Sequence, residues 1–306
     1  GAILSYLSLK KENFYMVENT VDGKFFVTAR GWEDLSEILK SYEELQVEIG
    51  EELIGEFLQK EEIARDFAGY YRLYEKYKSD YQIQEILDGN VTSRQLKTCC
   101  DMGKKASFEE RFTVTEMLLE AVTERISSFQ KTDEKTEKLY RNLKLLKVFL
   151  QEKNSVEAME QFIASRRKAL DAKICSELLT AEEAAREEEQ IRILEEYFFQ
   201  LKELHISDVA EGIEQIGERF GNVCRLRNEK LKETKKMLEQ AFSFLEECFG
   251  EGQELLLFET GLTGDDRCSI FISQYGCPSY FKHCELLLYS KKENEMRKEC
   301  RDLLEE

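Results

Sequence analysis

The scarcity of proline constrains this chain more than any other feature, because Pro278 is the only proline in 306 residues. Proline interrupts helices and central strands, since its ring fixes φ and removes a backbone N–H. Charged residues make up 35% of the chain, and the long charged side chains favour helices. The sequence therefore predicts a mainly α-helical protein with long, uninterrupted helices.

Apolar residues recur at three- and four-residue spacing along most of the chain, which is typical of amphipathic helices. The spacing predicts a helix from Trp32, one from about Lys60 to Asp88 and a short one from about Ser93. Long helices are expected over about 107–130, 133–152, 155–179, 181–204 and 222–249, and further helices over 269–275 and 280–289. The apolar run at 254–259 fits a buried strand or a helical turn equally well. The apolar stripes predict a packed bundle, with a groove for a partner helix as the alternative.

Local signals indicate where these helices begin and end. Thr180 and Glu183 fit a capping box, in which each side chain bonds the other residue's backbone N–H. Ser107 and Glu110 fit the same pattern. Gly89 suits a left-handed helix C-terminus, so the sequence places a domain boundary at Asn90. We expect a helical domain over 1–90 and a helical C-terminal extension over 91–306.

The charge and hydropathy of the chain exclude several partners. The formal net charge is −18, which argues against nucleic acid and against an anionic membrane surface, because both need surplus Lys and Arg on one face. No apolar run is long enough to span a membrane and no signal-peptide pattern is present. The sequence therefore predicts a soluble, cytoplasmic protein.

The chain has nine cysteines at irregular positions. An odd number without a framework pattern indicates reduced thiols rather than disulfides. Cys268, Cys277, His283 and Cys284 are residue types that suit zinc, but their spacing does not, because the adjacent His283 and Cys284 cannot easily bind one ion. We expect free thiols at these positions and no metal.

Arg30 is the candidate site residue, because it lies where an extended run gives way to a helix. Val21, Asp22 and Gly23 suit a turn, the segment 24–27 reads as extended, and the helical pattern begins at Trp32. A helix N-terminus favours anions, and a guanidinium there adds a bidentate grip on a phosphate oxygen. The alternative is a surface arginine paired with Glu33 or Asp34.

The segment from Ser8 to Asn90 resembles the helical lid of a MoxR-type AAA+ ATPase. The residues that carry the resemblance are Leu7–Leu9, Glu12–Tyr15, Thr20–Lys24, Thr28–Glu33, Ile63–Ala68, Tyr70 and Tyr71. The resemblance implies an AAA+ lid-like helical domain, followed here by a long-helix bundle, with at most a short β-hairpin near the N-terminus. Beyond residue 90 the chain resembles this family only loosely.

The resemblance also implies a role for Arg30. It matches the arginine that, in this family, reaches from the lid to the γ-phosphate of ATP held by the core domain, although Ala29 stands where many relatives have proline. It further implies ATP and Mg as cofactors of the complete enzyme, a ring oligomer and a von Willebrand factor A-type partner protein. The work of such an enzyme is chaperone-like remodelling or maturation of metal cofactors.

The sequence lacks the elements that bind ATP in such an enzyme. The nearest match to a P-loop is Met102-Gly103-Lys104-Lys105, which lacks the upstream glycine and the hydroxyl residue. No succession of strands alternating with helices is present. We therefore expect the C-terminal part of a larger ATPase, inactive alone. The alternatives are a stand-alone helical protein–protein interaction module and an enzyme whose site is assembled from dispersed residues.

Overall fold

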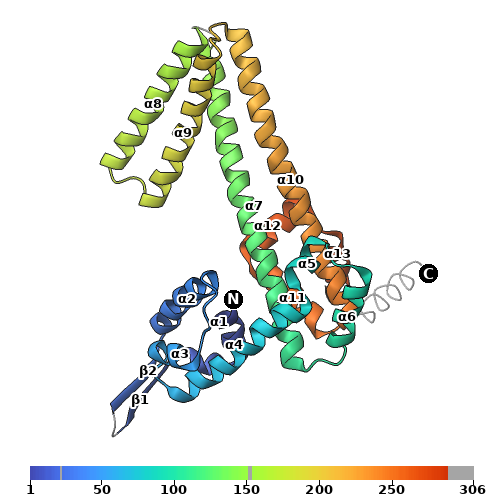
Figure 1. The fold of residues 1–306 in the computed structure, drawn as a ribbon. Helices are drawn as coiled ribbons and strands as arrows, with labels where there is room; N and C mark the ends of the chain where they lie inside the picture. Colours follow the sequence, from blue (N-terminus) through green and yellow to red (C-terminus); the bar gives the residue numbers. More distant parts are fainter. Residues whose placement is uncertain (21–22, 151–153, 289–306) are drawn as a thin grey trace, which may run out of the picture. The chain divides into compact units, whose positions relative to one another are not determined.

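The computed structural model describes residues 1–20, 23–150 and 154–288 (Figure 1). As the sequence predicts, the described chain is mainly α-helical, and its only strands form one short antiparallel hairpin near the N-terminus. It divides into two compact units, which are Gly1–Arg125 with Lys235–Glu306 (unit 1) and Ile126–Thr234 (unit 2). The division that the sequence suggests after Asn90 lies inside unit 1.

The N-terminal part of unit 1 contains short and medium helices around the hairpin. Its elements are α1 (Ala2–Leu9), the 3-10 helix η1 (Lys11–Phe14), β1 (Met16–Thr20), β2 (Gly23–Val27), α2 (Ala29–Glu44), α3 (Glu51–Phe57), α4 (Glu61–Tyr81), α5 (Ile83–Asp88) and α6 (Ser93–Gly103). In the hairpin, Met16 pairs with Val27 and Thr20 with Gly23. The predicted turn at Val21 and Asp22 lies outside the described residues.

The remaining elements are longer. They are α7 (Phe108–Leu150), α8 (Ser155–Cys175), α9 (Ala181–Glu203), α10 (Val209–Phe249), α11 (Gln253–Gly264), α12 (Asp266–Tyr275) and α13 (Pro278–Leu288). α7 leads the chain from unit 1 into unit 2, and α10 leads it back. Two helices were expected where α7 is a single helix, α10 begins earlier than expected, and the ambiguous run at 254–259 is helical.

Several helix ends follow the local signals. The capping box between Thr180 and Glu183 is present with both of its hydrogen bonds. Gly89 adopts a φ of 70° after α5, where a side chain would be strained. Pro278 is the first residue of α13, the one helical position at which a missing N–H costs nothing. None of the described helices is long and apolar enough to cross a membrane.

Aromatic side chains fill the core of unit 1. The rings of Tyr6 and Trp32 each lie 5.2 Å from the ring of Phe67, centroid to centroid, which brings α1, α2 and α4 together. Further along the chain, Phe242 of α10 packs edge-on against Phe258 of α11 at 5.2 Å. Such pairs add about 0.5–1.5 kcal/mol each beyond the area that they bury.

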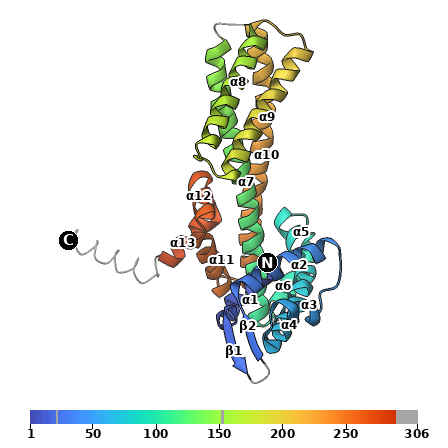
Figure 2. The same cartoon turned by 90° about the vertical axis from the view of Figure 1, so that its left-hand side faces the viewer.

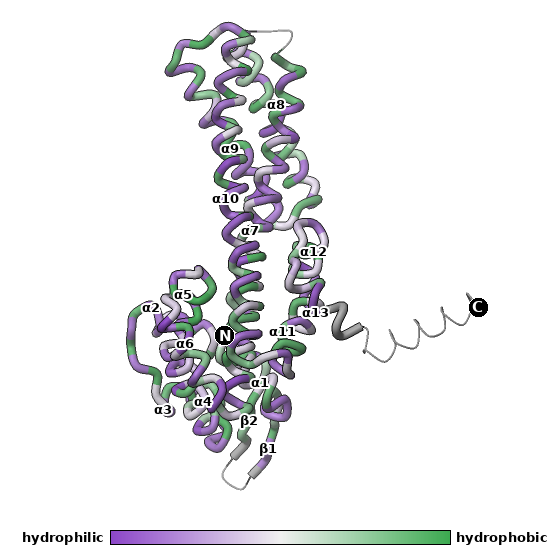
Figure 3. The backbone as a smooth tube through the Cα atoms, turned by 90° about the vertical axis from the view of Figure 1, so that its right-hand side faces the viewer, coloured by the Kyte–Doolittle hydropathy of each residue, from purple (hydrophilic) through white to green (hydrophobic). Residues whose placement is uncertain are grey.

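Unit 2 has one largely aliphatic core. α8 and α9 lie side by side (Figures 1 and 2), and Figure 3 shows hydrophobic and hydrophilic residues interleaved along both. The buried members of the core are Leu139, Leu146, Leu150, Ala158, Met159, Phe162, Ile163, Leu170, Ile191, Leu194, Tyr197, Leu201, Ile206 and Ile216. These residues come from α7, α8, α9, α10 and the α9–α10 connection. Most of the predicted apolar stripes therefore face an internal core, whereas Phe149 and Leu204 are exposed.

Candidate functional site

Arg30 lies in the first turn of α2. The helix begins at Ala29, and the side chain of Thr28 caps it by accepting a hydrogen bond from the Gly31 backbone N–H at 3.2 Å. Gly31 also permits α3 to approach, because a Cβ there would lie 2.7 Å from the carbonyl oxygen of Phe57. The start of α2 is therefore fixed by local capping on one side and by a close helix contact on the other.

The Arg30 side chain is 76% exposed and paired with acids of its own helix. Its Nε lies 3.0 Å from Asp34, and its Nη1 lies 3.6 Å from Glu33. These are the two partners expected of an ordinary surface arginine. Exposed pairs of this kind contribute about 0.3–0.5 kcal/mol, so an anionic ligand at the start of α2 would exchange them at little cost.

Three residues of the resemblance, Asn13, Trp32 and Asp66, pack near this helix start together with Tyr6 and Lys10. Trp32 is 3% exposed and donates its indole N–H to the Asn13 carbonyl at 3.2 Å. The Tyr6 hydroxyl donates to Asp66 at 2.7 Å, and Lys10 lies 2.5 Å from the same carboxylate. The hydrogen bonds from Tyr6 and Lys10 outweigh burial and lower the pKa of Asp66. The cluster fixes the direction in which α2 starts.

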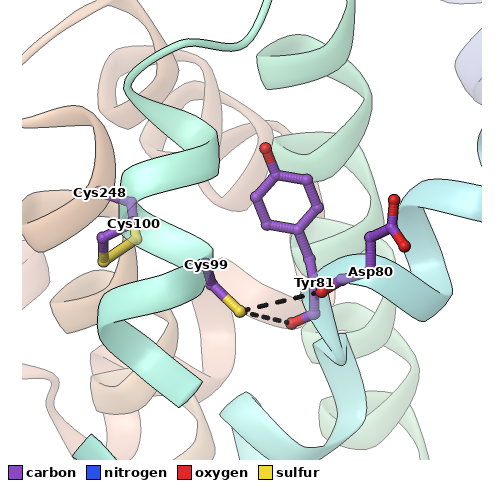
Figure 4. The surroundings of a disulfide bond; sticks show 5 residues. All are labelled: Asp80, Tyr81, Cys99, Cys100 and Cys248. Atoms are coloured by element: carbon purple, nitrogen blue, oxygen red, sulfur yellow. Dashed lines mark hydrogen bonds between the residues drawn. A yellow bond between two sulfur atoms is a disulfide. The ribbon is translucent and has the colours of Figure 1, made fainter. Parts of the chain in front are cut away.

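A disulfide joins α6 to α10 within unit 1 (Figure 4). It links Cys100 to Cys248, which are 148 positions apart in the sequence. The neighbouring thiol of Cys99 is free and buried, and points toward the backbone carbonyls of Asp80 and Tyr81. The expectation of reduced thiols is therefore wrong for Cys100 and Cys248, because helix packing brings together two cysteines that the sequence keeps far apart.

The suggested zinc ligands have separate partners. The Cys268 thiol lies 3.6 Å from the Thr123 hydroxyl, and the Cys277 thiol donates to Glu239 at 3.3 Å. Burial raises the pKa of Cys268 to about 11 and that of Cys277 to about 12, which disfavours the thiolate that a metal or a nucleophilic reaction needs. No group of three or more potential ligands occurs within the described part of the chain; the side chain of Cys284 lies outside it.

His283 is the centre of a buried polar cluster that the sequence did not reveal. It is 2% exposed, its Nε2 lies 2.5 Å from Glu246, and its ring stacks on Phe242. Burial acts to raise the pKa of Glu246, but the bonds and charges of His283 and Lys282 lower it overall.

Glu259 of α11 is a second acidic side chain near His283. It is 3% exposed, and its Oε1 has no hydrogen-bond partner. Burial raises the pKa of Glu259, with the nearby charge of His283 only partly opposing the rise. A buried carboxyl with an elevated pKa favours the protonated form more than an exposed one does.

The predicted site residue and the polar groups around His283 belong to different helices. Arg30 belongs to α2, whereas His283, Glu246 and Glu259 belong to α13, α10 and α11. Histidine, glutamate and cysteine separated by tens of residues carry no local pattern, so no signal in the sequence identifies the buried cluster or the disulfide.

The comparisons with known proteins add no relative. No family, no curated protein and no solved structure matches the chain. Its function is therefore inferred from its own residues and from the resemblance described above.

Proposed function

We propose that this chain is the lid and helical extension of a MoxR-type AAA+ ATPase, in which the lid closes over nucleotide held by a separate core. Arg30 is the residue that contacts the γ-phosphate. The observation that carries the proposal is the placement of Arg30 in the capped first turn of α2, with a side chain that is exposed rather than buried in the packing.

The surroundings of Arg30 fit a phosphate ligand. The first-turn N–H groups and the helix dipole favour an anion, and the guanidinium has the fork geometry that phosphate oxygens accept. The aromatic cluster of Tyr6, Trp32 and Phe67 holds the helix start in place. In this scheme ATP supplies the phosphate, and the core supplies the other phosphate and Mg contacts.

The complete enzyme, in this proposal, is a cytoplasmic ring oligomer that remodels a partner protein, and the partner has a von Willebrand factor A-type domain. Closure of the lid transmits the nucleotide state to the next subunit or to the partner. Residues 91–306 extend the lid.

The test uses this chain fused to the upstream segment of its parent gene. We expect no ATP hydrolysis by the 306 residues alone, turnover by the fusion, and at least a tenfold (order of magnitude) loss of turnover on Arg30→Ala, because an electrostatic contact to the transferring phosphate is removed. Arg141→Ala is the matched control, since Arg141 is also an exposed arginine, 68% exposed, in an i,i+4 pair with Glu137.

The outcome separates the alternatives. Unchanged turnover in the Arg30→Ala fusion removes Arg30 from the mechanism, and turnover by the isolated chain shows an active site of its own. If the chain does not associate with the upstream core at all, a helical interaction module is the better proposal. A shallow apolar hollow on unit 1 favours that second candidate, because Phe108 and Leu256 are 53% and 45% exposed at its edge.

A further inference from the structure

Unit 1 contains a cavity of about 810 Å³ that the Arg30 proposal does not use. It lies between α1, α2, α4, α5 and α7. Its volume falls within the range of about 300–1,000 Å³ that is typical of pockets for ligands or inserted side chains. The cavity is partly open to solvent, so an apolar group that enters it removes the apolar lining and its own surface from water.

The floor of the cavity is apolar and aromatic. Trp32, Leu39, Tyr71, Tyr74 and Met117 all line it, and all are at most 8% exposed. The two tyrosine hydroxyls are already satisfied, because Tyr71 donates to Glu43 at 3.0 Å and Tyr74 to Glu120 at 3.4 Å. Burial is the main cause that raises the pKa of both tyrosines, so they stay neutral. The floor therefore offers an apolar surface to an apolar side chain.

The rim of the cavity is acidic. The carboxylates that line it are Glu33, Glu37, Glu43, Glu120 and Glu124. The basic side chains that line it are Lys40 and Lys78, and both are already paired, with Glu37 at 2.8 Å and with Glu75 at 3.6 Å. Glu120 contacts the amino group of Gly1, and Glu33 pairs with Arg30. The rim still carries more negative than positive charge.

From the acidic rim and the apolar floor of the cavity, we propose that it binds a basic, amphipathic segment of a partner protein. One or two large apolar side chains of that segment occupy the floor, and its Lys or Arg residues lie against the rim carboxylates. Helix-in-groove recognition works in this way, with apolar anchors on one face and charges around them. Rim charges of one sign raise the association rate and exclude partners of the same sign.

The protein carries its own probe for this site. Trp32 is the only tryptophan of the chain, and it lines the cavity. The experiment titrates the full chain with a synthetic helical peptide of Leu, Phe and Lys that lacks tryptophan and tyrosine, and follows Trp32 emission. Two matched peptides replace all Lys by Glu, or all Leu and Phe by Ser. We expect a saturable change in emission with the basic apolar peptide only, and weaker binding at higher salt.

Variants of the rim then locate the site. Glu37→Lys with Glu124→Lys is expected to weaken binding by about tenfold or more, because it reverses two exposed rim charges. Glu160→Lys with Glu188→Lys makes the same change in net charge at exposed positions of unit 2, and is expected to leave the affinity within about twofold. Circular dichroism checks that both double variants are folded. The milder double variant, Glu37→Gln with Glu124→Gln, removes the two charges without reversing them, and is expected to show an intermediate loss of peptide affinity.

Two results would overturn the proposal. Equal weakening by the rim pair and by the unit 2 pair would mean that the peptide is attracted by overall charge rather than by the cavity. Binding of the Glu peptide, or of the Ser peptide, with the affinity of the basic apolar one would mean that charge, or the apolar floor, does not select the ligand. Neither result depends on Arg30 or on ATP, so the proposal stands or fails apart from the ATPase function.

Discussion

The two units of this protein differ in what their interiors contain. Unit 2 packs a largely aliphatic core from long helices, and one small hollow among α7, α8 and α9 measures about 20 Å³. Unit 1 has a partly open cavity of about 810 Å³ and contains a disulfide. Its buried tyrosines are bonded to carboxylates, as Tyr6 is to Asp66 and Tyr81 to Glu110.

The difference lies in open space and cross-linking more than in polarity. An aliphatic helical core gains stability from burial alone and has few groups that recognise a ligand. Buried polar atoms without partners occur in both units, as Glu259 in unit 1 and Gln190 in unit 2 show, so the large cavity and the disulfide are what distinguish unit 1. Both proposed sites lie in unit 1, since Arg30 belongs to α2 and the cavity is lined by unit 1 residues.

Loss of the disulfide is expected to have the largest effect, and to be confined to unit 1. A cross-link between residues 148 positions apart stabilises by about 4–5 kcal/mol in the chain-entropy description. In Cys100→Ser with Cys248→Ser, hydrogen exchange measured by mass spectrometry should rise in α6 and at the end of α10, but not in α8 or α9. Cys175→Ser, which removes an exposed thiol of unit 2, should leave hydrogen exchange unchanged in both units. Equal acceleration in both units would contradict the division.

The converse change in unit 2 is Leu194→Ala. Leu194 is fully buried, so the substitution leaves a cavity and should lower the free energy of unfolding by about 3 kcal/mol. Exchange should now rise in α8 and α9 and stay unchanged in α6. Leu178→Ala, at a position that is 72% exposed, is the control and should be close to neutral. If Leu194→Ala also accelerates exchange in α6, the units unfold as one.

Glycine substitutions provide a finer comparison. Gly31→Ala places a Cβ 2.7 Å from the Phe57 carbonyl oxygen, and should cost about 1–3 kcal/mol because α2 and α3 must separate. A Cβ added at Gly217 of α10, in unit 2, would meet no atom of the described chain within 4 Å beyond its chain neighbours and the local helix backbone. Gly217→Ala should therefore raise the free energy of unfolding by about 0.5–1 kcal/mol. Thermal unfolding measures both. Gly69→Ala, which is also unobstructed but lies in unit 1, should behave as Gly217→Ala does; a loss there would show that location rather than crowding decides the sign.

The smallest effect is expected from the buried carboxyl of unit 1. Burial raises the pKa of Glu259 in the folded state. Between the ordinary and the raised pKa the folded state binds the proton and the unfolded state does not, so the free energy of unfolding falls as pH rises through that window. Glu259→Gln removes this fall. The melting temperature of the variant minus that of the parent protein should therefore be about 2 °C higher at pH 7 than at pH 4.

Glu246→Gln is the control of opposite sign. The folded-state pKa of Glu246 is lowered, because the bonds and charges of His283 and Lys282 outweigh burial. Its contribution to stability is therefore present above the ordinary glutamate pKa and is lost as pH falls through the lowered one. The melting temperature of Glu246→Gln minus that of the parent protein should therefore be lower at pH 7 than at pH 4. Identical pH profiles for the two variants would refute the buried-cluster description.

Sequence reasoning identified most helices and one part of the candidate site. The start of α2, with Arg30 in its first turn, was predictable because capping and helical periodicity depend on residues a few positions apart. The break expected near Lys131 was wrong, because α7 continues through Thr132 and Asp133. There α10 lies alongside, with Arg227 2.6 Å from Asp133. A neighbouring helix thus holds together a polar stretch that looks like a boundary.

Local sequence signals were enough to predict the helical class, the capped ends at Gly89 and Thr180, and a helix that starts beside Arg30. The tertiary structure alone decided that Cys100 meets Cys248, that His283 meets Glu246, and that five helices of unit 1 leave a cavity with an acidic rim. The reason is physical. Local structure follows from interactions within one or two helical turns, whereas contacts between distant segments depend on how completed helices pack.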